Sequence, residues 1–295
     1  IPISPKLDDH RVGLVYALPV MALSFLYGPS GAILQGIYAK HFGLTLTTIA
    51  TVLLISRLFD ALSDPIIGYC ADRYHARHGT RKPFVVGGGL LFIFASWFLY
   101  VPPVNVSPIY FLVCFLAFYF AYTLFEIPHL AWGSELSIDS EDKNRIYGWR
   151  SCCWFIGGLF FYAIPLLPLF KTNEFTPETL KWSVLVAIVM MLPMLYMSIR
   201  FVPDHQSIQT HGSVVSYKKE SIVLLLQTIL RNKPLLILTA AHTCTGFGSG
   251  MWFTLLFIFV DSYLGLGHQF ALVYVTSFGL SILALRIWYK LALKL

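Results

Sequence analysis

Arg57, Asp60 and Asp64 lie at spacings of three, four and seven residues in an otherwise apolar run. These spacings place their side chains on one face of a helix. Two carboxylates one turn apart repel when both are ionised, and a nearby guanidinium, a proton or a small hard cation relieves that repulsion. Ser63 and Thr123 can add hydroxyl oxygens. The pattern favours a cation or proton site at Asp60 and Asp64, and the alternative is a structural salt bridge between Arg57 and one acid.

A third acid, Glu126, stands in another apolar run, two residues before Pro128. A charge near the middle of a bilayer costs roughly 2.5–3.5 kcal/mol on insertion scales, so such residues are functional candidates. Glu126 is predicted to bind a substrate or the cation, and the alternative is a helix-fixing ion pair with Arg57 or Arg150. Arg150 opens a further apolar run, where its side chain either points into a cavity or reaches the lipid headgroups.

The helices that must position these residues are long and apolar. Of the 295 residues, 57% are hydrophobic and only 12% are charged, against about 25% charged residues in a soluble domain. This composition argues against an ordinary soluble enzyme. Residues 221–230 are too short to span a bilayer and predict an interfacial piece. Eight segments reach the roughly 20 apolar residues that a spanning helix needs: 12–38, 45–71, 84–101, 107–132, 151–170, 182–202, 234–260 and 269–290.

The basic residues are distributed unevenly between the two ends of these segments. With the N-terminus inside, 17 of the 21 Lys and Arg residues fall between spans on the inner side, 3 on the outer side, and Arg57 within a span. Lys and Arg collect on the cytoplasmic side of membranes. We therefore expect a multi-pass protein of the cell (inner) membrane with a cytoplasmic N-terminus.

The order of the segments indicates three regions. Six spans fill residues 1–202, a polar cytoplasmic linker follows at 203–233, and two more spans lie in 234–295. This is the layout of a two-halved transporter. We predict an all-α polytopic membrane protein with an N-terminal six-helix bundle and the first two helices of a second bundle. Because the first residue is Ile1 and the second set of helices is incomplete, we expect the chain to be a fragment.

Motifs of other functions are missing from the sequence. It has no Gly-x-Ser-x-Gly, no His-Glu-x-x-His and no Walker motif, so we predict no enzyme and no cofactor. Basic residues lie between apolar runs rather than in one stripe, which argues against nucleic-acid binding. The cysteines are odd in number and lie in or beside apolar runs, which argues against a disulfide scaffold or a zinc site: Cys70, Cys114, Cys152, Cys153 and Cys244.

Two motifs together resemble a known transporter family. Residues 68–83 carry Gly-x-x-x-Asp-Arg followed by basic residues, which is similar to the loop between helices two and three of major facilitator superfamily transporters. Together with Arg-x-x-Asp-x-x-x-Asp-Pro at 57–65, this resembles the glycoside–pentoside–hexuronide:cation symporters, the melibiose-carrier-like family. Glu-Ile-Pro at 126–128 resembles the Asp-Ile-Pro of helix four in that family, and Arg150 falls where it has an arginine in helix five. The resemblance covers residues 10–202 most fully.

The resemblance implies the major facilitator fold of two six-helix bundles and cation-coupled sugar uptake. It implies a cation site for Na⁺ or H⁺ with Ser63 between the paired acids, and a sugar site with contributions from two helices. The family places an acid in helix one where this chain has Ser24, and an aromatic where it has Leu130, with Trp132 close by; both count against galactoside specificity. Ser63 stands where Asn is frequent, which counts against a sodium preference. The residues assigned by resemblance are Asp60, Asp64, Ser63 and Thr123 for the cation, and Glu126, Arg150, Ser24 and Trp132 for the substrate.

Secondary active symport is the predicted function. A proton or Na⁺ between Asp60, Asp64 and Glu126 lowers their repulsion and favours sugar binding, and this coupling is reciprocal. Lysolipid or another amphiphile is an alternative substrate within the same family, and a drug:proton antiporter is an alternative with the same fold. Expected partners are a small-molecule sugar and membrane lipid, with no nucleic acid, and the protein is expected to be a monomer. The loops at 72–83 and 133–150 are predicted cytoplasmic latches that use Asp72, Arg73, Arg81, Glu135 and Arg145.

Overall fold

The computed structural model describes residues 9–170, 173–204 and 231–292. Within these ranges every regular element is helical, as predicted. The long helices are α1 (Asp9–Ala32), α2 (Leu34–Phe42), α3 (Leu46–His78), α4 (Lys82–Tyr100), α5 (Pro108–Glu135), α6 (Ser140–Ala163), α7 (Pro177–Phe201), α9 (Lys233–Ile258) and α10 (Phe270–Ala292). Short helical turns lie at Ile164–Leu166, Phe259–Tyr263 and Gly267–Gln269.

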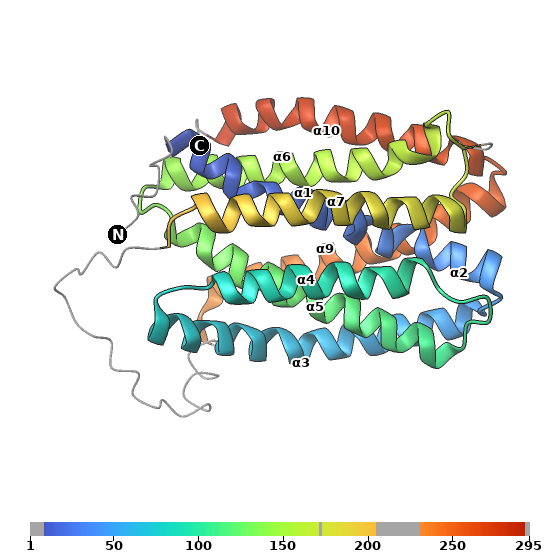
Figure 1. Cartoon of the computed structure of the whole chain (residues 1–295), viewed down its shortest axis with the longest axis horizontal. Coiled ribbons are helices and arrows are strands. Elements are labelled where there is room, and N and C mark those ends of the chain that lie inside the picture. Colours follow the sequence, from blue (N-terminus) through green and yellow to red (C-terminus); the bar gives the residue numbers. More distant parts are fainter. Residues whose placement is uncertain (1–8, 171–172, 205–230, 293–295) are drawn as a thin grey trace.

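In the described ranges, seven helices are long and apolar enough to cross a membrane, so the chain is an integral multi-pass membrane protein. They are α1, α3, α4, α5, α7, α9 with the turn that follows it, and α10 up to Ala284. The expected span at 151–170 is not among these seven; it corresponds to α6, whose first half carries Glu141, Asp142, Lys143 and Arg145. Figure 1 shows α6 lying along the same bundle as the others, beside α10.

The first predicted span, 12–38, is two helices rather than one. Only Ile33 lies between α1 and α2, and its N–H still donates to the Pro29 carbonyl at 2.9 Å. Proline removes a helical N–H and crowds the preceding turn, and kinks concentrate at such positions. Hydropathy alone did not reveal this bend, because both pieces are apolar.

Two helices extend beyond their predicted apolar spans. α3 continues from the expected end at 71 to His78, where Gly79 adopts φ 70° and closes the helix. α6 begins at Ser140 instead of 151 and ends at Ala163 instead of 170. Asp139 caps its start by accepting two backbone N–H groups. The predicted loops at 72–83 and 133–150 are therefore mostly helical, because polar helix ends carry no hydropathy signal.

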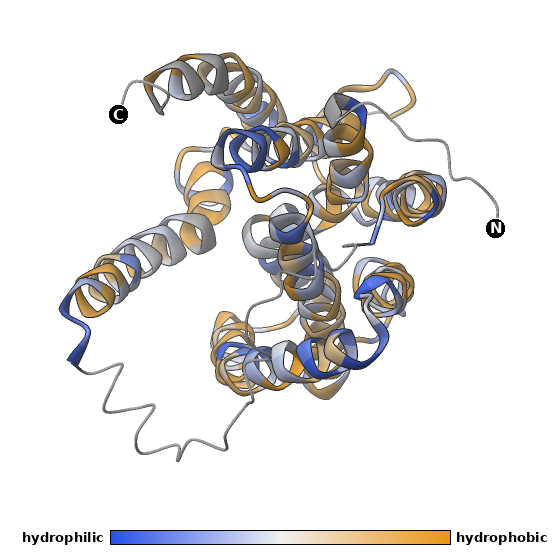
Figure 2. Cartoon of the chain, turned by 90° about the vertical axis from the view of Figure 1, so that its left-hand side faces the viewer, coloured by the Kyte–Doolittle hydropathy of each residue, from blue (hydrophilic) through white to orange (hydrophobic). Residues whose placement is uncertain are grey.

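The helices pack through small residues and aromatic side chains. α1 packs on α6 and α7, α4 on α5 and α7, and α3 on α5. A Cβ at Gly88 of α4 would lie 2.4 Å from the backbone nitrogen of Phe125 in α5, so the two backbones approach as closely as small residues allow. α9 differs, because Figure 2 shows it inclined away from the bundle at the end where it begins. The predicted interfacial piece at 221–230 and most of the linker at 203–233 lie outside the described residues.

Candidate functional site

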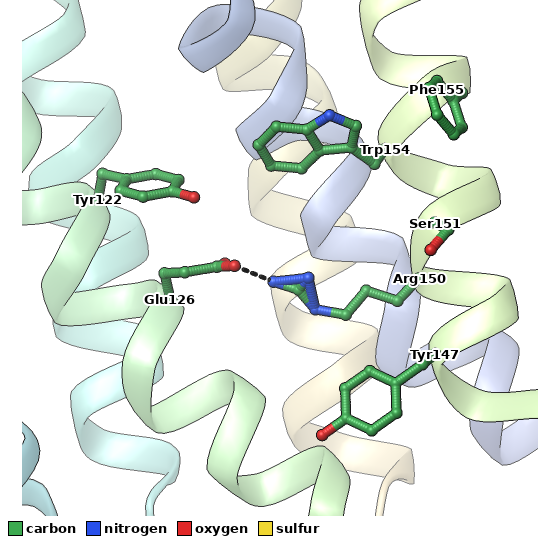
Figure 3. A pocket seen from close by; sticks show the side chains of 7 residues that line it. All are labelled: Tyr122, Glu126, Tyr147, Arg150, Ser151, Trp154 and Phe155. Carbon is green, nitrogen blue, oxygen red and sulfur yellow. Dashed lines mark hydrogen bonds and ion pairs between the residues drawn. The ribbon is translucent and has the colours of Figure 1, made fainter. Parts of the chain in front are cut away.

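A pocket of about 330 Å³ lies between α5 and α6. This volume falls in the range of small-molecule sites, which combine apolar walls with a few polar groups. Figure 3 shows side chains from the two helices facing each other across the pocket. The lining residues are Tyr122 and Glu126 from α5, and Tyr147, Arg150, Ser151, Trp154 and Phe155 from α6.

Glu126 and Arg150 form an ion pair across this pocket. Arg150 Nη2 donates to Glu126 Oε1 at 2.5 Å, and the two side chains are 9% and 14% exposed for Arg150 and Glu126 respectively. Glu126 Oε2 and Arg150 Nε are buried and have no hydrogen-bond partner in the described part of the chain. The pair is therefore balanced in charge, yet each member keeps one unused polar atom. Arg150 does not begin its helix, as the sequence suggested, but lies in the interior of α6.

Neighbouring side chains hold this pair in place. The Tyr147 hydroxyl donates to the Leu130 carbonyl at 3.0 Å and so ties α6 to α5 beside the pocket. Tyr27 of α1 stacks on Tyr122 with ring centroids 3.8 Å apart and stands edge-on to Trp154 at 5.7 Å. Aromatic pairs at these distances stabilise a fixed arrangement of rings. The pocket walls are thus supported from a third helix.

The acids of α3 lie on the face opposite its exposed apolar stripe. Leu58, Leu62 and Ile66 recur every four residues and are 61%, 70% and 62% exposed, as a lipid-facing stripe requires. Asp60 and Asp64 are half-buried, and each has one buried carboxylate oxygen, Oδ1, without a hydrogen-bond partner among the described residues. Both acids therefore lie on one face of α3, as their spacing predicted, and that face is turned away from Leu58, Leu62 and Ile66.

Arg57 forms an ion pair with the other carboxylate oxygen of Asp60, Oδ2. Its Nη1 lies 3.2 Å from Asp60 Oδ2, and its Nη2 lies 3.5 Å from the Tyr119 hydroxyl. The guanidinium also sits 4.8 Å from the centroid of the Tyr119 ring, a cation–π contact. Ser63 is buried and donates to the Asp60 carbonyl at 3.4 Å, and Thr123 is buried on α5. The salt bridge considered as an alternative exists, and Asp64 remains outside it.

The structure does not gather the three acids into one ligand set. No group of three or more His, Cys, Asp or Glu side chains that could hold a metal occurs in the ranges described. Glu126 turns toward α6 and Arg150, whereas Asp60 and Asp64 stay on α3. This conformation does not bring the three acids together, and a proton or Na⁺ site between Asp60, Asp64 and Glu126 stays a prediction.

Two residues assigned to the substrate by resemblance lie away from the pocket lining. Ser24 is 2% exposed and donates to the Met21 carbonyl, and a Cβ on Gly157 of α6 would lie 2.1 Å from its Oγ. Trp132 is 1% exposed and donates its indole N–H to the Pro203 carbonyl at 3.1 Å. Both are packing residues in this structure. Matching positions to a family does not determine which face of a helix a side chain occupies.

Three of the predicted latch residues meet at the end of the bundle where α4 begins. Arg81 donates to Asp72 Oδ1 at 2.5 Å and to Glu135 Oε1 at 2.9 Å, which joins α3 to α5. Burial alone would lower the pKa of Arg81. Its hydrogen bonds and ion pairs with Glu135 and Asp72 raise the pKa by more than burial lowers it, so the net shift is upward. Arg73 instead donates to the Tyr69 hydroxyl, and Arg145 pairs with Asp142 on its own helix.

The sequence reasoning missed most of the pocket wall. Tyr147, Ser151, Trp154 and Phe155 were not proposed as site residues, although they lie three, one, four and five positions from Arg150. Residues three and four apart share a helix face. For Tyr147 and Trp154 that periodicity around Arg150 was the available signal, whereas Ser151 and Phe155 do not follow it.

Known proteins match this chain over much of its length. The family described as MFS/sugar transport protein matches residues 15–295. A putative glycoside/cation symporter, YagG of Escherichia coli K12, is 29% identical over 54% of this chain and 36% of its own length. A symporter, YnaJ of Bacillus subtilis 168, is 27% identical over 62% of this chain and 40% of its own. The lactose permease of Lactobacillus delbrueckii is 24% identical over 83% of this chain and 41% of its own.

These matches agree with the motifs and the helical fold. The matched region covers about half or less of the length of these curated relatives. The family match extends over nearly all the described helices, and the relatives carry the names of symporters, carriers and permeases. The chain therefore belongs to the MFS/sugar transport family, as one of the glycoside–pentoside–hexuronide:cation symporters of the major facilitator superfamily, which are transporters and not enzymes.

Proposed function

We propose that the protein carrying this chain is a secondary active symporter that couples entry of Na⁺ or H⁺ to uptake of a sugar or glycoside. The observation that carries the proposal is the Glu126–Arg150 pair, which is buried in a pocket with aromatic walls and retains one unused acceptor and one unused donor. A sugar hydroxyl both donates and accepts, so adjacent hydroxyls of one ring match these two atoms. Burying them with partners recovers the free energy that unpaired polar groups lose.

The walls of the pocket support the same substrate class. Tyr122 and Trp154 present aromatic faces above the ion pair (Figure 3). The C–H faces of a sugar ring are apolar and pack against such rings, while its hydroxyls reach the charged pair. Relatives named for glycosides, glucuronide and lactose support a sugar over a lysolipid, a drug or another amphiphile.

Asp60 and Asp64 are the proposed site of the coupling ion. Each keeps a buried, unpartnered carboxylate oxygen, and carboxylate oxygens suit a proton or a small hard cation. Arg57 partly neutralises Asp60 in this conformation. An arriving ion would supply positive charge in its place, with Ser63 and Thr123 as further oxygen sources.

A continuous set of contacts connects the two proposed sites. Arg57 touches Tyr119, Tyr119 stands edge-on to Tyr27 at 5.6 Å, and Tyr27 stacks on Tyr122 of the pocket. Coupling requires that ion binding change the arrangement at the sugar site, and the effect must be equal in both directions. This aromatic series supports a route by which a displaced Arg57 shifts the pocket wall.

The layout and orientation belong to the same proposal. Residues 1–202 form the first half of the transporter, 203–233 the cytoplasmic linker, and 234–295 the beginning of the second half. The N-terminus is cytoplasmic in the cell membrane, so the Arg81–Asp72–Glu135 cluster is a cytoplasmic latch. The 17-to-3 distribution of basic residues supports this orientation, and the protein is proposed to act as a monomer.

Equilibrium binding of radiolabelled glycosides to the purified protein tests the proposal. Titrations are run with and without Na⁺, and at two pH values. We expect a panel of neutral and acidic glycosides to contain a ligand whose affinity rises with Na⁺ or with protons. If no sugar in the panel binds, or if binding is unaffected by either ion, the proposed function is wrong.

A further inference from the structure

The end of the bundle opposite Arg81 contains a contact between α2 and the end of α9. Every residue from 233 to 252 is exposed, so α9 leaves the bundle over most of its length. It meets the other helices only near its last turns, where Phe257 is 7% exposed. Figure 2 shows this inclination of α9 relative to the rest of the chain.

The ring of Phe257 packs directly against Gly36 of α2, and the space above this glycine is here called the seat of Phe257. A Cβ at Gly36 would lie 2.3 Å from Phe257 Cδ1 and 2.5 Å from Cε1, which is closer than carbon atoms can approach. Phe257 has little freedom to move aside, because it stands edge-on to Phe270 with ring centroids 5.0 Å apart. The contact therefore exists only because position 36 has no side chain.

One turn along α2, Lys40 forms an ionic bridge over this contact. Its Nζ lies 3.4 Å from Asp261 Oδ2, in the turn after α9, and 3.8 Å from Glu174 Oε2, in the segment before α7. Burial and the Lys40 ammonium lower the pKa of the adjacent His41. Lys40 and Glu174 are about half exposed, and ion pairs of this exposure are weak.

We propose that Gly36, Lys40, Glu174, Phe257 and Asp261, here called the α2–α9 seam, form a gate that is closed in this conformation. One bulky side chain in a glycine seat closes it, and a weak, exposed ion bridge secures it. These contacts are strong enough to keep the gate closed and weak enough to break when it opens. Opening requires Phe257 to leave Gly36 and Asp261 to leave Lys40, while α10 stays against α6 through the stacked rings of Tyr162 and Tyr274.

The arrangement explains why the two ends of the bundle differ. At the Arg81 end, the first part of α9 is exposed, and the salt bridges of Arg81 join α3 to α5. At the Lys40 end, the ionic bridge joins α2 to the turn after α9. Closing one end while the other is apart is what a transporter needs in order to expose a central site to one side at a time.

Distance measurements between two spin labels test the seam without any substrate. Labels are introduced as genetically encoded residues at Leu46 and Leu264, which are 55% and 47% exposed, so the native cysteines remain in place. The seam predicts one main distance in the unmodified protein. Gly36→Ala removes the seat and Lys40→Glu places like charges together, so each adds a population longer by roughly 5 Å or more, about one helical turn.

The controls separate the seam from general damage. Gly28→Ala, at a glycine with open space around it, leaves the distance unchanged. The exchange Lys40→Glu with Asp261→Lys restores the original distance. If Gly36→Ala and Lys40→Glu both give the distribution of the unmodified protein, or if the exchange restores nothing, the seam is not a gate. Should Gly36→Ala fail to fold, the Lys40 and exchange variants decide. The measurement uses no sugar and no ion gradient. Its result therefore does not depend on whether the proposed symport is correct.

Discussion

Arg150 and Glu126 are 24 residues apart in the chain, and their side chains meet at 2.5 Å between α5 and α6. Two opposite charges in an apolar bundle neutralise each other, which makes their burial tolerable. The same pair leaves Glu126 Oε2 and Arg150 Nε unused beside the pocket. The arrangement stabilises the contact between the helices and prepares it for a polar ligand.

Glu126→Gln tests both roles of the pair. It leaves a buried guanidinium without a counter-charge, and breaking a buried pair in this way costs about 3–5 kcal/mol. We expect a lower melting temperature in detergent and at least a tenfold loss of glycoside affinity by equilibrium binding. Glu178→Gln, at an exposed carboxylate in the first turn of α7, is the matched control and should change neither quantity. Unaltered affinity in Glu126→Gln would remove this carboxylate from the site.

Arg57→Gln tests competition between the guanidinium and the coupling ion. Arg57 lies 3.2 Å from Asp60, so its removal frees a carboxylate oxygen and eliminates a repelling positive charge. We expect the apparent affinity for Na⁺ or H⁺, read from ion-dependent glycoside binding, to rise several-fold. Arg73→Gln on the same helix is the control, since Arg73 contacts the Tyr69 hydroxyl rather than an acid. A fall in ion affinity would mean that Arg57 positions the site instead of competing for it.

Gly88→Ala tests the close approach of α4 and α5. The added methyl would lie 2.4 Å from the backbone of Phe125, which cannot rotate away. Overpacking of a core costs about 1–3 kcal/mol, so we expect a melting temperature several degrees lower. Gly87→Ala is the neighbouring control, because a Cβ there meets nothing within 4 Å. Equal melting temperatures for the two variants would contradict this packing.

Arg81→Ala tests the cluster at the beginning of α4. Arg81 is 9% exposed and holds Asp72 and Glu135 together, so its loss leaves two acids without their shared partner. We expect faster amide hydrogen exchange in the last turns of α3 and α5. Arg77→Ala, at an exposed arginine in the last turn of α3, should leave exchange in α5 as it was. Unchanged exchange in Arg81→Ala would show that the cluster does not join these helices.

The sequence predicted the features that depend on spacing and apolar length. Apolar runs identified the spanning helices, and the spacing of Asp60 and Asp64 identified the helix face that they share. Glu126 and Arg150 were candidates because charge is costly in such runs. Their pairing was one of two alternatives, since helix-to-helix contacts do not follow from a single helix.

Other features depend on side-chain direction and on polar helix ends. The bend at Ile33 and the early start of α6 at Ser140 carry no hydropathy signal. Ser24 and Trp132 stand at positions that suited a sugar site, but they face neighbouring helices and pack there. Separation of Glu126 from the acids of α3 required the orientation of α5 between α3 and α6, which only the assembled bundle determines.

Gradient-driven accumulation of a glycoside in proteoliposomes tests the central claim, that Asp60 and Asp64 bind the ion whose entry drives uptake. The protein carrying this chain is compared with Asp60→Asn and Asp64→Asn under an imposed Na⁺ or pH gradient, with Glu178→Gln as the control. We predict that both variants lose accumulation against the gradient, while Glu178→Gln keeps it. Accumulation that persists unchanged in both Asp60→Asn and Asp64→Asn would contradict the account.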